Sequence, residues 1–299
     1  MNYAMIDIGS NTVKMTVYGA DKTIIKKYSH PTSLLSYIEN GALTAVGIAR
    51  LLATLTDYQS RAERDGARVY AYATASLRDL SNRDGVVSYI KERSGLAIDV
   101  VSGEEEARLS FDGIAAVSGI DPTSHTVLDL GGGSLEIAAY ENDSLVAHSF
   151  RFGALAMYLR FVKNILPTRE ELSTLYGAVT AEAASVPLPK NRGNALAVGG
   201  SLRAFCHILA HTKGEKYDET RPYFVKREEA EAFLKKVTDA DRATELMLIE
   251  LEPKRIHTVT PGLCAFLALL DLTGHRDFTV VSGGTREGYL DRIIKKETI

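Results

Sequence analysis

Two stretches of the chain alternate hydrophobic and polar residues around a turn that contains glycine, and both follow the same pattern. Residues 5–29 read MIDIGSNTVKMTVYGADKTIIKKYS, and residues 127–150 read VLDLGGGSLEIAAYENDSLVAHSF. This alternation predicts that each stretch forms an antiparallel meander of strands. The stretches align without a gap, which pairs the following residues: Asp7 with Asp129, Gly9 with Gly131, Thr12 with Ser134, Lys14 with Glu136, Tyr18 with Tyr140 and Asp21 with Asp143.

Two later landmarks repeat in the same order. YAYATASLR (70–78) resembles LAVGGSLR (196–203), and IDVVSGEEEAR (98–108) resembles FTVVSGGTREG (278–288). Short strings of apolar residues and glycine recur by chance, because turn chemistry recurs. Three matches in one order nevertheless favour an internal duplication. We therefore predict two similar domains in tandem, residues 1–124 and residues 125–299.

Helical periodicity fills the intervals between these strands. Thr44 is the predicted cap of a helix that runs to about Asp65, residues 104–117 begin with an acidic turn, and Thr168 begins a capping box. The second copy has an additional, mostly helical stretch over residues 207–277. Residues 285–299 form a predicted terminal helix that can pack back on the first domain. The order of three strands followed by alternating helices and strands, used twice, predicts a mixed α/β protein.

Composition indicates a soluble globular chain, with 45% hydrophobic and 24% charged residues. No apolar run reaches the roughly 18 residues of a membrane span, and the N-terminus lacks the basic region of a signal peptide. Cys206 and Cys264 are too few for a disulfide framework and fit reduced core positions. These features predict a cytoplasmic protein. A net charge of −3 argues against nucleic acid or membrane partners.

Six motifs span nearly the whole chain: DIGSNT (7–12), YATASLRDLSN (72–82), VVSGEEEARL (100–109), LDLGGGSLE (128–136), AVGGSLRA (197–204) and GGTREGYL (283–290). Together they resemble the exopolyphosphatase and guanosine pentaphosphate phosphatase family, in a short two-domain form. The resemblance implies two duplicated actin/hexokinase-type (ribonuclease H-like) domains with an interdomain cleft. It also implies a hydrolase that uses Mg²⁺ or another divalent cation to cleave the terminal phosphoanhydride of polyphosphate or pppGpp.

The implied partners are polyphosphate or guanosine penta- and tetraphosphate, and the resemblance allows a homodimer. The chain departs from the family over residues 28–37, YSHPTSLLSY, which hold His30 and no arginine. Many family members carry a basic Arg-x-x-Leu-Gly-like stretch there. The departure bears on the choice of substrate.

Glycine turns expose backbone N–H groups that can bind phosphate, and this predicts phosphate-binding loops. The candidates are Gly9, Ser10, Asn11 and Thr12 in the first copy, Gly131, Gly132, Gly133 and Ser134 in the second, and Arg78, Gly199 and Gly200 beside later strands. The alternative is two tight hairpins that need glycine for positive φ. Gly9 alone fits that alternative, whereas three consecutive glycines exceed what a hairpin requires.

Carboxylates stand beside both loops. Asp7, Asp129 and Glu136 are the candidate metal ligands, because hard oxygen ligands suit Mg²⁺. An aspartate that only stabilises a turn is the alternative. Two carboxylates at equivalent positions of two repeats favour the metal role.

The resemblance implies that Glu106 is the general base, since the family's catalytic glutamate immediately precedes the Ala-Arg of this motif. It would orient or deprotonate the water that attacks the terminal phosphorus. The alternative is that all three glutamates of residues 104–106 complement the helix dipole, and the residues alone do not choose among them. Arg78 would neutralise phosphate charge, with a surface salt bridge as its alternative; Arg203 and Arg286 are lesser candidates.

Two other functions remain open from the sequence. One is a phosphotransferase of the same fold, similar to sugar or acid kinases, and the other is a non-catalytic binder of an alarmone or polyphosphate. His207 and His211 share a helix face but lack the glutamate of a zinc motif, so they fit ordinary helix histidines. The charged run over residues 226–236 fits a solvated helix face.

Overall fold

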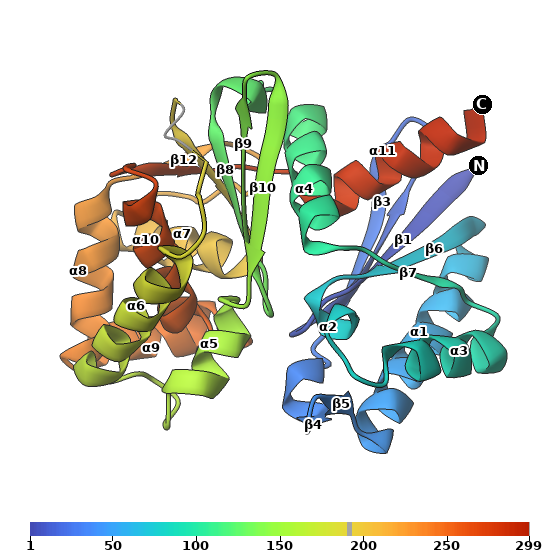
Figure 1. The fold of residues 1–299 in the computed structure, drawn as a ribbon, viewed down its shortest axis with the longest axis horizontal. Helices are drawn as coiled ribbons and strands as arrows, with labels where there is room; N and C mark the ends of the chain where they lie inside the picture. The colour runs from blue at the N-terminus through green and yellow to red at the C-terminus, as the bar shows by residue number, and fades with distance from the viewer. Residues whose placement is uncertain (190–192, 299) are drawn as a thin grey trace. The chain divides into compact units, whose positions relative to one another are not determined.

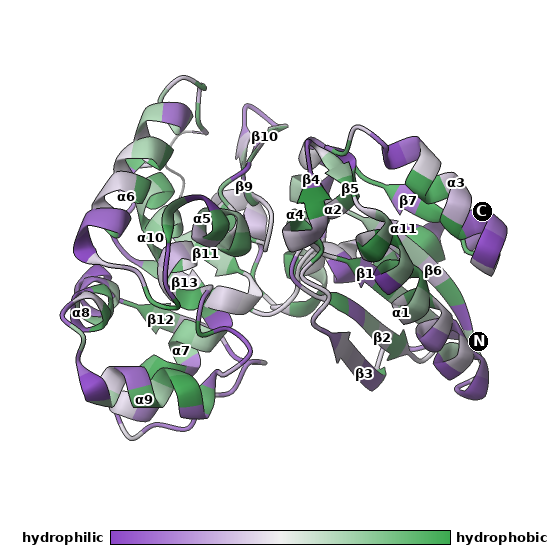
Figure 2. Ribbon diagram, turned by 90° about the horizontal axis from the view of Figure 1, so that it is seen from below, coloured by the Kyte–Doolittle hydropathy of each residue, from purple (hydrophilic) through white to green (hydrophobic). Residues whose placement is uncertain are grey.

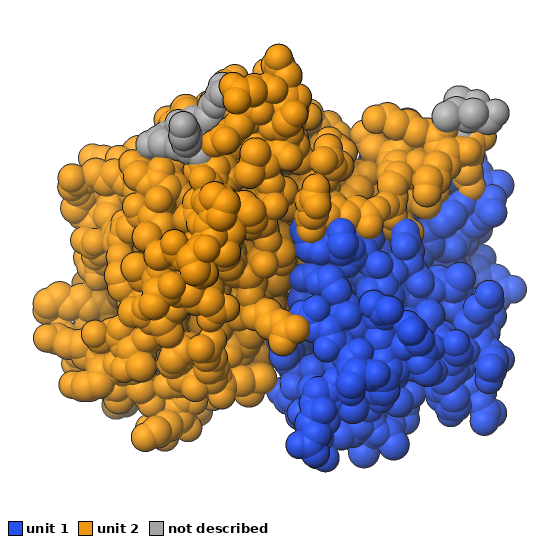
Figure 3. Space-filling view, in the orientation of Figure 1, with its two compact units in different colours: residues 1–103 blue, residues 104–299 orange. Residues whose placement is uncertain are grey.

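The computed structural model describes residues 1–189 and 193–298 and forms two compact units, Met1–Gly103 and Glu104–Ile299 (Figure 3). Ile299, the last residue of the predicted terminal helix, lies outside the described part. The division into compact units falls between residues 103 and 104, and the domain boundary at residue 124 stays a prediction. Helix α4 (Gly103–Val117) explains the division, because its buried Ala107 and Phe111 belong to one cluster with Val127 of the second sheet.

The first unit contains a five-stranded sheet in the order β3-β2-β1-β6-β7 (Figure 1). β1, β2 and β3 pair antiparallel, and β6 and β7 continue the sheet in parallel. The strands are β1 (Asn2–Ile8), β2 (Val13–Tyr18), β3 (Ile24–His30), β6 (Ala67–Ala73) and β7 (Ile98–Val100). The remaining elements of the unit are η1 (Leu34–Tyr37), β4 (Ile38–Glu39), β5 (Ala42–Leu43), α1 (Ala45–Arg64), α2 (Ala75–Arg78) and α3 (Arg83–Ser94).

The second unit repeats this topology. Its sheet has the order β10-β9-β8-β11-β13-β12, so β12 is an additional antiparallel edge strand. The strands are β8 (Thr126–Leu130), β9 (Leu135–Glu141), β10 (Ser144–Phe150), β11 (Ala195–Val198), β12 (Tyr223–Val225) and β13 (Phe278–Val280). The shared order confirms the duplicated α/β fold. The sequence did not predict β12, which lies within residues 207–277, the stretch expected to be mostly helical.

Helices of the second unit pack around α10 (Val259–Leu272), in which every residue from Val259 to Leu270 is buried. By contrast, α8 (Arg227–Thr238) is mostly hydrophilic, and Arg227 pairs with Glu231 at 2.7 Å, as expected of a solvated face (Figure 2). Thr168 caps its helix through the predicted capping box with Glu171. The other elements are η2 (Pro122–Ser124), α5 (Ala154–Phe161), α6 (Arg169–Ala183), α7 (Gly200–Thr212), α9 (Arg242–Leu251) and α11 (Thr285–Thr298).

Two predictions about the chain as a whole can be compared with these elements. Cys206 and Cys264 are buried and free, as the sequence predicts. Among the described residues, no helix combines the length and the apolar character needed to cross a membrane.

Glycines let α4 and α11 touch backbone to backbone. A Cβ added to Gly113 of α4 would lie 1.9 Å from the carbonyl oxygen of Gly284, just before α11. A Cβ on Gly288 of α11 would lie 2.0 Å from the carbonyl oxygen of Leu109. Real Cβ atoms cannot approach that closely, so only glycine permits this crossing.

We expect Gly113→Ala to lower the free energy of unfolding by roughly 1–3 kcal/mol, because the methyl group forces the backbones apart. Gly177→Ala in α6 is the matched control, since nothing lies within 4 Å of its added Cβ. There alanine should stabilise the helix by roughly 0.5–1 kcal/mol. Urea denaturation of both variants measures the difference, and equal effects would contradict this account of the α4–α11 contact.

Candidate active site

The register of the first strand pair in each unit places matching residues face to face. Asp7 lies directly opposite Lys14 in β1–β2, and Asp129 lies directly opposite Glu136 in β8–β9. Side chains directly opposite one another share a face of the sheet. The first unit therefore sets a carboxylate against an amine, whereas the second sets two carboxyl groups against each other.

Helix α4 adds Glu106 to the pair in the second unit. Glu136 is 1% exposed and Glu106 is 6% exposed, so neither can rely on bulk water. Burial first, and then the charges of Glu106 and Asp129, raise the pKa of Glu136 well above its usual value. Ser149 on β10 donates a hydrogen bond of 2.7 Å to Glu136 Oε1, while the buried Oε2 accepts none within the described structure. Glu136 thus holds a proton to higher pH than an ordinary glutamate does.

The loop between β8 and β9 packs against the start of α5. Ala154 N–H donates to the carbonyl of Gly131 at 3.0 Å, and Leu155 N–H donates to the carbonyl of Gly132 at 2.9 Å. These carbonyl oxygens, which would repel an anion, are therefore engaged by the helix. Gly153 permits this contact, because its Cβ would lie 2.3 Å from the backbone nitrogen of Ser134.

The first glycines of the two loops occupy equivalent environments. An added Cβ on Gly9 would lie 2.8 Å from the carbonyl oxygen of Thr12, and one on Gly131 would lie 3.1 Å from that of Ser134. Neither glycine has φ in the left-handed region, so the positive-φ alternative does not explain them. Close backbone packing within the turn requires both.

The stretch that departs from the family contacts the loop of the first unit. Ser33 N–H donates to the carbonyl of Asn11 at 2.9 Å, and Leu35 N–H donates to that of Ser10 at 3.4 Å. The hydroxyl of Ser10 is buried and has no hydrogen-bond partner within the described residues. Residues 28–37 therefore shape the loop directly, although they carry no arginine.

Arg78 ends the short helix α2 in the first unit, and its side chain is 15% exposed. Its guanidinium lies 4.0 Å from Asp79 and 3.5 Å from the carbonyl oxygen of Val101. A distance of 4.0 Å is long for an ion pair, and the Arg78 side chain is more buried than is usual for a surface salt bridge.

Gly199 and Gly200 have internal packing roles that the sequence did not reveal. Gly199 has φ of 132°, and its Cβ would lie 2.3 Å from the carbonyl oxygen of Leu130. Arg255 covers Gly200, since an added Cβ would lie 2.3 Å from its Nη2. Burial, with repulsion from Arg203, lowers the pKa of Arg255 to about 10, so it stays cationic at neutral pH. Arg255 carried no sequence signal, because it lies in an irregular segment before α10.

The carboxyl groups of the second unit fit a divalent cation that also binds a phosphate. Asp129 and Glu136 present carboxyl oxygens on one face of the sheet, and Glu136 Oε2 is a buried acceptor with no donor among the described residues. Within the part of the chain that the structure describes, no group of three or more His, Cys, Asp or Glu is arranged so that it could hold a metal ion. Mg²⁺ commonly uses one or two carboxylates and completes its shell with water and substrate phosphates.

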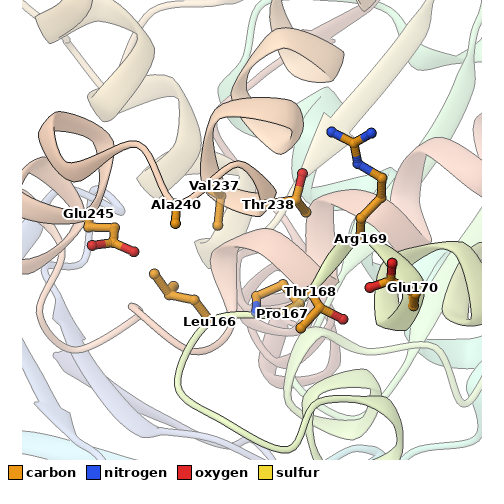
Figure 4. Close-up of a pocket in the computed structure, with 9 residues that line it drawn as sticks. All are labelled: Leu166, Pro167, Thr168, Arg169, Glu170, Val237, Thr238, Ala240 and Glu245. Atoms are coloured by element: carbon orange, nitrogen blue, oxygen red, sulfur yellow. The ribbon is translucent and has the colours of Figure 1, made fainter.

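Two other features of the second unit lie apart from these carboxyl groups. A surface hollow of about 460 Å³ adjoins the start of α6 and is lined by Leu166, Pro167, Thr168, Arg169, Glu170, Val237, Thr238, Ala240 and Glu245 (Figure 4). It contains no candidate site residue. His207 Nδ1 lies 2.9 Å from Glu252 Oε1, which fits the ordinary helix histidine predicted for it.

We expect Glu136→Gln to stabilise the metal-free protein increasingly as pH rises. Folding raises the pKa of Glu136 above its usual value of 4.5, so the unfolded chain loses this proton at lower pH than the folded chain does. The free energy of unfolding of the wild type therefore falls as the pH rises from 4.5 to the pKa of the folded state. Within that window the advantage of the variant should grow by up to about 1.4 kcal/mol per pH unit. Urea denaturation with a chelator across pH 4–8 tests this. A difference that is constant with pH would contradict it.

Solved structures with the same fold cover almost the entire chain. An exopolyphosphatase from Cytophaga hutchinsonii superposes with a TM-score of 0.82 and 19% identity, covering 99% of this chain and 98% of that one. A Ppx/GppA family member from Aquifex aeolicus gives a TM-score of 0.78 and 23% identity, covering 100% and 99%. These similarities establish the fold.

Sequence comparison gives curated relatives and a family. Exopolyphosphatase 1 of Mycobacterium tuberculosis is 28% identical over 196 residues, which are 62% of this chain and 56% of that protein. The guanosine-5′-triphosphate,3′-diphosphate pyrophosphatase of Photobacterium profundum is 26% identical over 305 residues, which are 98% of this chain and 59% of that protein. The chain thus spans just over half the length of these curated relatives. The sequence profile of the Ppx/GppA phosphatase family matches residues 19–297, and the chain belongs to this family.

Proposed function

We propose that the protein is a phosphohydrolase that cleaves the terminal phosphoanhydride of inorganic polyphosphate, of pppGpp, or of both. The observation that carries this proposal is the group of three acidic residues in the second unit: the facing pair Asp129 and Glu136, joined by buried Glu106. Family membership supports it, as do the activities named for the curated relatives. The protein would act in the cytoplasm, on soluble substrates.

Glu106 is proposed to act as the general base. It would accept a hydrogen bond from the attacking water and take its proton as the new P–O bond forms. Phosphoryl transfer needs positioning and charge stabilisation more than covalent help, so an oriented water and fixed donors suffice. The leaving phosphate chain departs with the electron pair of the cleaved P–O bond.

The loop of Gly131, Gly132, Gly133 and Ser134 is proposed to bind the phosphate that is attacked, through backbone N–H groups other than that of Gly131, which donates to the carbonyl of Ser134 at 2.9 Å. The carbonyl oxygens of Gly131 and Gly132 accept hydrogen bonds from the start of α5, which turns these oxygens away from a phosphate. This supports the proposed role of the loop. In the first unit, the Gly9–Thr12 loop and Arg78 are proposed to bind phosphate in the same way. Gly199 and Gly200 pack against Leu130 and Arg255, so their proposed part in phosphate binding is to place the cationic Arg255 and not to contact phosphate themselves.

Asp129 and Glu136 are proposed to hold Mg²⁺ or another divalent cation, and Asp7 is the corresponding candidate in the first unit. When bound, the cation would neutralise charge that develops on the phosphate oxygens. Glu136 would have to lose its proton before it binds the cation, and its raised pKa moves that loss to higher pH. Cation binding should therefore strengthen as pH rises.

We expect Glu106→Gln to lower kcat for orthophosphate release by roughly 10²–10⁴-fold, because the amide cannot accept the proton of water. Glu104→Gln is the matched control, since it removes the same charge from the same first turn but lies exposed. It should change kcat by less than about threefold, the size of a helix-dipole effect. Equal losses in both variants would show that the negative charge of this helical turn, and not proton transfer to Glu106, determines kcat.

Orthophosphate release with Mg²⁺ should be measured on short polyphosphate, long polyphosphate and pppGpp. Turnover of any of these, lost on chelation, supports the proposed function. Transfer of phosphate from ATP to an acceptor without hydrolysis would support a phosphotransferase instead. Tight binding of these ligands by calorimetry, with no turnover under any divalent cation, would identify a binder.

A further inference from the structure

A hydroxyl pair contacts the Asp129 carboxylate from two helices. Ser110 of α4 donates a hydrogen bond to Asp129 Oδ2, and Thr285 Oγ1, at the start of α11, lies 3.3 Å from the same oxygen. The two hydroxyl oxygens are 3.0 Å apart. Two hydroxyl protons thus serve three contacts, so Ser110 donates to the carboxylate while Thr285 shares its proton between Ser110 and Asp129.

Ser110 makes this contact instead of the usual one for a helical serine. Serine within a helix commonly donates to the carbonyl four residues earlier. Ser118, at the end of the same helix, does this, since its Oγ lies 2.8 Å from the carbonyl oxygen of Ile114. Ser110 is 1% exposed and turns its hydroxyl towards β8. The buried hydroxyl of Ser110 therefore finds its acceptor in Asp129 and not in its own helix.

The spacing along α4 connects this contact to the general base. Glu106 and Ser110 are four residues apart, so they lie on one face of the helix, a single turn from each other. A bond from Ser110 to Asp129 therefore fixes how far the Glu106 backbone stands from the Asp129 carboxylate. The ion pair between Arg292 of α11 and Glu105 ties the same turn of α4 to α11.

The backbone crossing of α4 and α11 brings Thr285 to this place. Gly113 and Gly284 meet one turn beyond Ser110, and Gly288 meets Leu109. With a Cβ at these positions, the helices would separate, and Thr285 would leave Ser110. A carboxylate beside the first residue of α11 is also favoured by the positive end of the helix dipole.

We infer that Ser110 and Thr285 are positioning residues that hold the Asp129 carboxylate at a fixed distance from Glu106. This inference rests on the proposed hydrolysis, because it assigns Asp129 and Glu106 to one reaction. The hydroxyls touch no substrate, and they act through Asp129. Their loss should lower the rate of the chemical step more than the binding of substrate.

The test uses Thr285→Val, Ser110→Ala and both together, in the full chain. We expect each single variant to lower kcat for orthophosphate release by roughly 10–100-fold, with KM changed by less than about threefold, because misplaced groups slow the reacting step. The double variant should lose little more than either single one, since both hydroxyls serve one carboxylate. Thr285→Ser restores the hydroxyl and should bring kcat back to within about threefold of wild type.

Two matched controls separate positioning from simple loss of a hydroxyl. Ser118→Ala removes a serine whose hydroxyl bonds the carbonyl of Ile114 and the N–H of Ile120 but not Asp129. Thr260→Val removes a buried hydroxyl without a partner in the described structure. Both should keep wild-type kcat. If Thr285→Val fails to fold, Ser110→Ala carries the test, because it deletes a hydroxyl without adding a methyl group beside the crossing of α4 and α11.

The outcomes distinguish this inference from the proposed function. A wild-type protein that releases orthophosphate from none of the substrates overturns the proposed function, and the inference with it. An active wild type overturns the inference alone if folded Ser110→Ala and Thr285→Val keep normal kcat, or if Thr285→Ser does not restore it. A loss confined to KM also overturns it, because it would indicate a substrate contact.

Discussion

The register of β8 and β9 sets the constraint on which the second unit depends. It places Asp129 opposite Glu136 in a buried strand pair, and α4 adds Glu106 to them. Three acidic side chains in a poorly solvated space repel one another, so the folded chain must protonate one of them or bring a cation. The surrounding hydroxyls of Ser110, Ser149 and Thr285 stabilise the remaining charge by hydrogen bonds. The same repulsion destabilises the fold, and a bound cation would relieve it.

The duplicated architecture makes this constraint visible by contrast. The two sheets share their strand order, and the two turns share the contact of their first glycine. At the position of Glu136, however, the first unit has Lys14, which faces Asp7 and offsets its charge. One scaffold thus carries an electrically balanced pair in one unit and an unbalanced pair in the other. Chemistry that needs a cation is expected where the charges are unbalanced, which favours Asp129 over Asp7 as a ligand.

Backbone contact between α4 and α11 fixes the positions of the residues that these helices contribute to the site. Glycines at their crossing remove the side-chain layer that normally separates packed helices, so a small displacement is not absorbed by flexible groups. Glu105, for which the sequence allowed a role at the helix dipole, pairs with Arg292 of α11. The first turn of α4 is thereby held on one side by an ion pair and on the other by the Ser110 contact with Asp129. Rigid support of this kind is what a water-positioning carboxylate requires.

Much of the molecule could be predicted from the sequence, because its signals are local or repeated. Periodicity and turn residues gave the two meanders, the capping of the helices at Thr44 and Thr168, and the match of Asp7 with Asp129. The role of Glu106 came from the resemblance, since three adjacent glutamates look alike in a helical turn. Arg255, Ser110 and Thr285 could not be found, because each acquires its partners from segments distant in sequence. The chain alone therefore determined which residues repeat and which carry charge, whereas only tertiary packing decided that Glu136 is buried beside two other carboxyl groups, since burial and proximity arise when separate elements meet.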